Sequence, residues 1–141
     1  NPSEIYDTPA NRFVADFIGE TNMLNATIQK IDGDKIICRL QSGQFLNAKS
    51  NSKVNVGQSG AISIRPEKLI IKKQSFKGQN LEGKLGQSTY IGTDTQFEVL
   101  LDKELSLTAR MQNSSLTSEK YKNGDQVFLS IDDDAAWFLV D

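Results

Sequence analysis

The stretch that decides the fold is Pro9 to Leu24, which reads PANRFVADFIGETNML and joins an expected helix to the first expected strand. Thr8 suits the N-cap, because its hydroxyl can accept a hydrogen bond from a first-turn N–H group, and Pro9 suits the first helical position. Gly19 can take the left-handed conformation that ends a helix. Apolar side chains between them recur at spacings of three and four residues and form one stripe: Phe13, Val14, Phe17 and Ile18. The pattern predicts a helix over residues 9 to 18, whose stripe packs on its own domain or partly on a preceding one.

Beyond Gly19 the sequence alternates with the period of β-strands. Apolar residues alternate over 24–28, 35–40, 61–65, 97–101, 105–111 and 127–131, and shorter strands are expected over 45–49, over 69–71 and around Trp137. Turn signals separate these runs, namely Asp32-Gly33-Asp34, Ser42-Gly43, Gly92-Thr93-Asp94 and Asn123-Gly124-Asp125. The chain is therefore expected to be mainly β.

The polar stretch Lys72 to Gln79 is the best internal boundary, because it separates two β-rich halves at about residues 22–72 and 80–141. Each half has few strands with which to close a barrel, so we expect the halves to exchange strands. The predicted fold is an N-terminal helix followed by two interlocked small β-barrel halves.

Overall composition indicates a soluble domain with a core of its own. A length of 141 residues fits one domain or two very small ones. The net charge of −2, from 16 basic and 18 acidic residues, argues against a nucleic-acid or lipid-surface binder. No apolar run approaches the roughly 20 residues that cross a bilayer, so no direct membrane insertion is expected. The chain begins at Asn1 rather than Met, from which we expect a piece of a longer protein.

The segment Arg65-Pro66-Glu67 interrupts the strand pattern, since Pro66 has no N–H group to donate to a sheet. Arg65 and Glu67 can form a charge-assisted pair that fixes the turn, or they can face a partner subunit. As a catalytic pair they lack a nearby nucleophile or base. They are the candidate site residues, with a turn-fixing or subunit-contact role.

No catalytic, cofactor-binding or metal-binding residue is predicted. Histidine is absent, and no phosphate-binding Gly-x-x-x-x-Gly-Lys-Ser/Thr pattern occurs. Asp132 to Asp134 are consecutive, whereas calcium loops alternate their ligands, so a solvated turn is expected. Cys38, the single cysteine, is expected to be a small buried hydrophobe. Seven aromatics could stack nucleobases, but most of them alternate and should be core: Phe45, Phe76, Tyr90, Phe97, Tyr121, Phe128 and Trp137.

Four segments together resemble a known family. They are Glu4 to Leu24, the strand-Arg-Pro-Glu-Lys-Leu run that ends at Leu69, the turn Tyr90-Ile91-Gly92, and the ending from Gly124 to Trp137. The pattern is similar to ATP-binding subunits of bacterial ABC importers, above all those for spermidine and putrescine. In that family a nucleotide-binding domain leads into a C-terminal β-domain called TOBE, so the resemblance implies that the two barrel halves are of the oligosaccharide/oligonucleotide-binding (OB) type. One departure is Ile131, where many members of the family carry a tryptophan.

The resemblance implies both a domain assignment and a function. Residues 1–21 would be the end of the nucleotide-binding domain with its connector helix, and 22–141 the regulatory and dimerisation β-domain. The parent would be an ABC-type polyamine-transporting ATPase, peripheral to the cytoplasmic face of the bacterial inner membrane. Its ATP and magnesium would bind upstream, so this fragment would be no enzyme and hold no cofactor. The implied partners are a second copy of the subunit and the membrane-spanning permeases, with no nucleic acid.

Three alternatives remain open at this point. One is a stand-alone small-ligand or oxyanion-binding β-domain, which a convergent polar pocket at the interface between the halves would favour. Another is the same domain from an iron(III), sulfate or sugar importer, because the motifs are only weakly specific for the solute. A nucleic-acid-binding barrel is a third reading, and it would need an exposed basic groove with aromatic residues.

Overall fold

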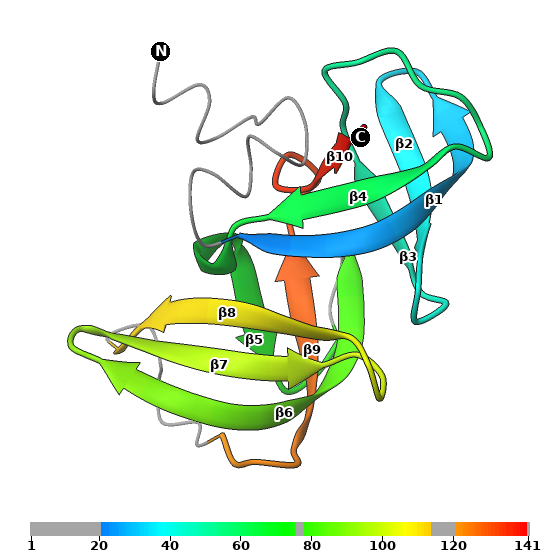
Figure 1. Cartoon of the computed structure of the whole chain (residues 1–141). Coiled ribbons are helices and arrows are strands. Elements are labelled where there is room, and N and C mark those ends of the chain that lie inside the picture. Colours follow the sequence, from blue (N-terminus) through cyan, green and yellow to red (C-terminus); the bar gives the residue numbers. More distant parts are fainter. Residues whose placement is uncertain (1–20, 76–77, 114–120, 141) are drawn as a thin grey trace. The chain divides into compact units, whose positions relative to one another are not determined.

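The computed structural model describes residues 21–75, 78–113 and 121–140. The expected helix over residues 9 to 18 lies outside these ranges, as does nearly all of the expected connector, residues 1–21. Ten strands and one short 3-10 helix make up the regular structure of the described residues, and the strands form two five-stranded antiparallel sheets (Figure 1). The expectation of a mainly β chain is confirmed.

The first sheet belongs to a compact unit, called unit 1, made of the chain up to Arg65 together with Asp132–Asp141. Its strand order is β10-β4-β1-β2-β3. The bounds are β1 Asn22–Asp32, β2 Lys35–Leu40, β3 Phe45–Ala48, β4 Ser59–Ile64 and β10 Trp137–Leu139. Gly33 makes the β1–β2 turn with a φ of 65°, a conformation that glycine adopts without strain.

The sheet of unit 1 curls until its two end strands meet. Lys49, just after β3, forms a parallel bridge with Trp137 of β10. The Lys49 N–H donates to the Ala136 carbonyl at 3.0 Å, and the Phe138 N–H donates to the Lys49 carbonyl at 2.7 Å. These bonds close the sheet into a small barrel.

The inner face of this barrel is apolar, as the alternating sequence predicts. Gly60 of β4 packs so closely against β10 that a Cβ there would lie 2.5 Å from the Leu139 carbonyl oxygen and 2.6 Å from Phe138 Cζ. The largest fully buried side chains of unit 1 are Leu24, Ile28, Leu46, Ile62, Ile64 and Phe138. Cys38 is buried among them, which confirms its predicted role as a small hydrophobe.

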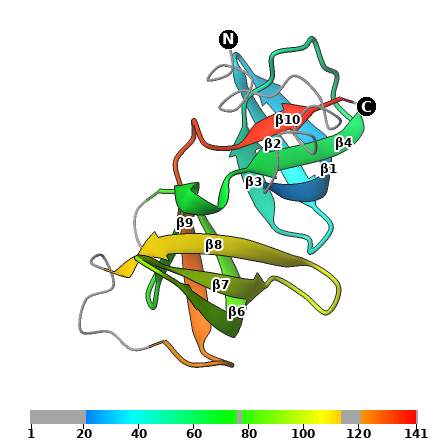
Figure 2. The same cartoon turned by 60° about the vertical axis from the view of Figure 1, so that its left-hand side comes forward.

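The second sheet forms unit 2, Pro66–Ile131, with the order β5-β9-β6-β7-β8. Figure 2 shows β6, β7 and β8 side by side in this order. The bounds are η1 Pro66–Lys68, β5 Leu69–Lys72, β6 Asn80–Ile91, β7 Asp94–Leu100, β8 Ser106–Gln112 and β9 Gln126–Ile131. The edge strands β5 and β8 contact each other, so this sheet is curled as well. Its largest fully buried side chains are Leu69, Ile71, Leu81, Leu85, Leu107 and Leu129.

Strand exchange between the two halves is visible in the pairing. β5 precedes the polar stretch Lys72 to Gln79, yet it pairs with β9, and Leu69 faces Ile131 in the register. β10 ends the chain, yet it pairs with β4 of unit 1. The compact units therefore change at residues 65/66 and 131/132, whereas the sequence placed its halves at 22–72 and 80–141. Hydrogen-bonded partners, rather than the longest polar linker, determine which sheet a strand joins.

Candidate functional site

Arg65 and Glu67 flank the start of the 3-10 helix η1. Arg65 follows β4 directly and is half-buried, Pro66 is buried as the first residue of η1, and Glu67 is exposed. Pro66 ends the β4 strand as predicted, because it cannot extend the hydrogen-bonded ladder. A turn-fixing or subunit-contact role for Arg65 and Glu67 stays a prediction.

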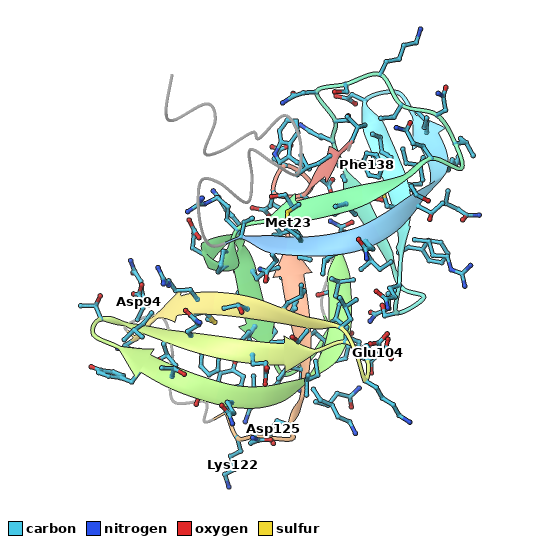
Figure 3. All side chains as sticks on the ribbon, in the orientation of Figure 1. Met23, Asp94, Glu104, Lys122, Asp125 and Phe138 are labelled. Atoms are coloured by element: carbon cyan, nitrogen blue, oxygen red, sulfur yellow. The ribbon has the colours of Figure 1, made fainter. Side chains whose placement is uncertain are left out.

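Glu67 belongs to a groove of unit 2, called here the seam groove, where the sheet edges β5 and β8 come together. The groove has a volume of about 420 Å³. Its charged lining residues are Glu67 from η1, Lys72 from β5, Asp94 from β7 and Arg110 from β8. Figure 3 shows Asp94 at the hairpin end of β7. Apolar side chains of Leu69, Ile70 and Met111 complete the lining.

The seam groove forms because β5 and β8 are the two ends of the strand order and share no ladder among the described residues. Its two acidic and two basic side chains, together with the apolar residues of the lining, make it a mixed surface of charged and apolar groups. Such a surface suits a polypeptide partner whose rim carries both charges, since non-obligate protein interfaces combine an apolar centre with a polar rim. It holds no serine, threonine, cysteine or histidine that could act as a nucleophile or base.

Sequence reasoning found Glu67 but missed Lys72, Asp94 and Arg110. These three residues are far apart in the chain, and each follows ordinary strand alternation, so nothing local marks them. Arg110 occupies an outward position between Ala109 and Met111 on a strand whose other side faces the core. The antiparallel register, which pairs Asp94 with Gln112 and Gln96 with Arg110, places Asp94 and Arg110 at one end of the β7–β8 pair. The curl of the sheet, which brings β5 into contact with β8, adds Lys72.

The three consecutive aspartates lie in the turn that leads into β10 of unit 1, and all three are exposed. Asp133 pairs with Lys35 at 3.7 Å, and Asp134 pairs with Lys49 at 2.5 Å. The Lys49 ammonium, by hydrogen bonding first and by its charge second, lowers the pKa of the Asp134 carboxyl. The same pair raises the pKa of Lys49. These lysines are the partners of the acidic turn, and the described residues contain no group of three or more metal-ligating side chains of the His, Cys, Asp or Glu type.

The aromatic residues divide between core and surface. Phe97 is buried, and Tyr121 packs edge-on against it with ring centroids 5.8 Å apart. Most of the seven aromatics were expected in the core, and two of the seven are exposed, Phe45 by 53% and Tyr90 by 74%. Phe45 faces Arg39 on the outer side of the barrel of unit 1, and Tyr90 lies near the tip of the β6–β7 hairpin, next to Ile91 and Gly92. These two side chains therefore lie outside the core.

Comparison with known proteins places this fold in a family. The TOBE domain family matches residues 62–139, more than half of the chain. The chain belongs to the TOBE domain family. None of the described residues lies in a helix long and apolar enough to cross a membrane.

The TOBE domain is similar to several curated proteins over almost its whole length. It is 36% identical over 137 residues to the spermidine/putrescine import ATP-binding protein PotA of Roseobacter denitrificans, with 96% of this chain and 38% of the relative covered. It is 38% identical over 141 residues to PotA of Mesorhizobium japonicum, with 100% of this chain and 38% of the relative covered. For PotA 1 of Pseudomonas aeruginosa the identity is 36% over 140 residues, with 99% and 37% covered. The chain thus spans little more than a third of the length of these relatives.

A solved structure has the same fold. A molybdate-bound crystal structure of the cytoplasmic molybdate-binding protein ModG matches with a TM-score of 0.75. The match covers 85% of this chain and 96% of that protein at 12% sequence identity. At this identity the likeness supports the fold alone. It supports the expectation of OB-like β-barrel halves.

Proposed function

We propose that this TOBE domain is the regulatory and dimerisation part of the ATP-binding subunit of an ABC importer for spermidine or putrescine. The observation that carries the proposal is the extent of the similarity. Three relatives that bear the spermidine/putrescine name match 96% or more of the chain at 36 to 38% identity. A shared fold alone would not support this proposal, because one fold serves many functions.

In this proposal the whole subunit hydrolyses ATP, and this domain does not. ATP and magnesium bind to the part of the relatives that this chain does not match. The domain carries no phosphate-binding Gly-x-x-x-x-Gly-Lys-Ser/Thr pattern with which to hold a nucleotide triphosphate. The subunit works at the cytoplasmic face of the bacterial inner membrane, where it drives the membrane-spanning permease subunits.

The domain acts by holding two ATP-binding subunits together. A tether keeps the two subunits at a high effective concentration after ATP has left, so that they close again without searching in solution. A contact that differs in free energy between the open and closed subunits then regulates the cycle by that difference. The seam groove, with Glu67, Lys72, Asp94 and Arg110, supplies an apolar centre and mixed charge for such a contact.

Analytical ultracentrifugation and transport together test this role. The full-length subunit carrying Arg110→Gln should show weaker self-association and altered control of ATP hydrolysis, while ATP binding is unchanged. Lys84→Gln removes the same charge from an exposed position of β6 outside the seam groove and is the matched control. Uptake of labelled spermidine by cells that lack their own importer reports the solute. Unchanged association, turnover and uptake after removal of the whole domain would contradict the proposal.

The alternatives have less support. The relatives reported above are named for spermidine and putrescine rather than for iron(III), sulfate or sugars. Uptake measured with each of these solutes in the same cells decides between them.

A further inference from the structure

A second groove lies on the outer face of the barrel of unit 1, over β1, β2 and β4. Its volume is about 570 Å³, within the range of about 300 to 1,000 Å³ that small-molecule sites occupy. Five exposed polar side chains line it: Asn25, Thr27, Arg39, Gln41 and Ser59. We call it the Arg39 groove.

The charge of the Arg39 groove sets it apart from the rest of this acidic chain. Although the chain has 18 acidic residues, the residues that line the groove include no carboxylate. Arg39 supplies the only full charge among these lining residues, and two hydroxyls and two amides surround it. A guanidinium presents several N–H groups in a fixed plane that matches a phosphate group, and hydroxyls donate to the remaining phosphate oxygens. The lining therefore favours an anion.

Strand register arranges the donors in one row. Thr27 of β1 faces Arg39 of β2 on one side and Ser59 of β4 on the other. The Thr27 and Ser59 hydroxyl oxygens are 3.4 Å apart. Because neighbouring strands are about 4.8 Å apart, the row from Ser59 to Arg39 covers about 10 Å. One phosphate group and its first ester substituent fit within that length.

Phe45 extends the same row by one strand. It faces Arg39 across β2 and β3 and therefore lies on the same side of the sheet. Its side chain is 53% exposed. An exposed aromatic ring next to a guanidinium offers a stacking surface for a planar ring, and such stacking tolerates many ring types.

We propose that the Arg39 groove binds a phosphate ester of the size of a nucleoside monophosphate. Arg39, Thr27 and Ser59 hold the phosphate, Gln41 and Asn25 hydrogen-bond the polar middle of the ligand, and Phe45 stacks on its ring. The site would make the domain a sensor of a small phosphorylated metabolite, which is a role beyond joining two subunits. It needs no metal ion and includes no covalent step.

Calorimetric titration of the 141-residue chain with adenosine monophosphate tests the proposal, with adenosine and inorganic phosphate as separate ligands. Adenosine monophosphate should bind saturably and at least tenfold more tightly than either part. Arg39→Gln should weaken it at least about tenfold, the effect of losing one charge-assisted pair. Lys53→Gln removes the same charge from an exposed loop of unit 1 and should leave binding unchanged. Phe45→Ala should weaken adenosine monophosphate while leaving inorganic phosphate unaffected.

Several results would overturn this assignment. No binding of adenosine monophosphate at millimolar concentration would do so, as would equal binding of adenosine, which would show that the phosphate is not recognised. Equal effects of Arg39→Gln and Lys53→Gln would reduce the interaction to general charge. If inorganic phosphate bound as tightly as adenosine monophosphate, stacking on Phe45 would contribute nothing to binding. Thermal melting of each variant checks that its fold is intact, and amide shifts of Thr27 and Ser59 in NMR spectra locate the ligand.

Discussion

Replacing Phe138 by alanine should destabilise the barrel of unit 1 by several kcal/mol. Phe138 lies in the three-residue strand β10 (Figure 3). Its side chain is only 2% exposed. Its ring contacts the backbone of Gly60, and backbone cannot move in to fill the space. Removing a buried phenylalanine side chain typically costs about 3 to 5 kcal/mol, because the lost transfer energy is joined by the energy of the cavity.

Urea unfolding followed by tryptophan fluorescence measures this cost directly. Trp137 is the single tryptophan of the chain and precedes Phe138, so the signal reports on unit 1. With a slope of about 2 kcal/mol per molar urea, a loss of about 4 kcal/mol lowers the midpoint by about 2 M. Tyr90→Ala is the matched control, because Tyr90 is 74% exposed and its truncation should cost less than about 0.5 kcal/mol. A loss below about 1 kcal/mol for Phe138→Ala would refute the assignment of β10 to the core of unit 1.

Gly60→Ala should also lower the urea midpoint, by the equivalent of about 1 to 3 kcal/mol of unfolding free energy, because the new Cβ overlaps Phe138. An unchanged midpoint would mean that β4 and β10 can separate without cost. The pKa of Asp134, lowered by Lys49, should return to its ordinary value in Lys49→Gln, as measured by NMR titration of the carboxyl carbon. The stability that this pair contributes is complete above the unfolded pKa of about 3.9 and is lost as the pH falls through the lower folded pKa. Identical Asp134 titration curves in the original protein and in Lys49→Gln would exclude the Lys49–Asp134 pair in solution. Burial raises the pKa of the Cys38 thiol to about 12. A thiol reagent at pH 8 should therefore react with Cys38 only once urea unfolds the chain. Equal reaction rates in the folded and the unfolded chain would contradict this.

Much of the fold could be predicted from local sequence, because turns and alternation are local properties. Gly33 and Gly92 take the positive φ values that their turn signals implied, at 65° and 78°. Pro66 ends β4 at the predicted place. Alternation shows which side of a strand faces the core, but it carries no information on which strand lies alongside. The sheet membership of β5 and β10 therefore followed only from the register.

The candidate sites also depend on which strands lie side by side, which the sequence pattern does not show. Arg65 and Glu67 are neighbours in sequence, so a pattern could single them out. The seam groove adds Arg110 because β8 contacts β5 and η1. The Arg39 groove adds Thr27 and Ser59 because β1 pairs with β2 and with β4. Residue types alone mark none of these, since an outward arginine or serine is ordinary on a half-exposed strand.

The sequence could not show which of the seven aromatics lie outside the core, for a related physical reason. Phe45 begins β3 in an outward position, and its alternation with Leu46 shows equally well that Leu46 is the buried residue. Tyr90 lies near the end of the 12-residue strand β6, which continues past the core beneath it. A pattern of period two fits either phase near the end of a strand, and packing against the rest of the barrel decides the phase.

Strand pairing also explains how one chain can build two sheets when unit 2 is a single segment inserted between the two parts of unit 1. Unit 2 is continuous from Pro66 to Ile131, whereas unit 1 is completed only by the segment after it. The β5–β9 ladder joins the beginning and the end of this inserted segment, since Leu69 faces Ile131. The ends of the unit 2 segment are therefore held beside each other, the arrangement that lets one domain be inserted into another. The β5–β9 ladder thus keeps the chain leaving Ile131 close to the point where unit 2 began, so β10 needs only a short connection before it pairs with β4.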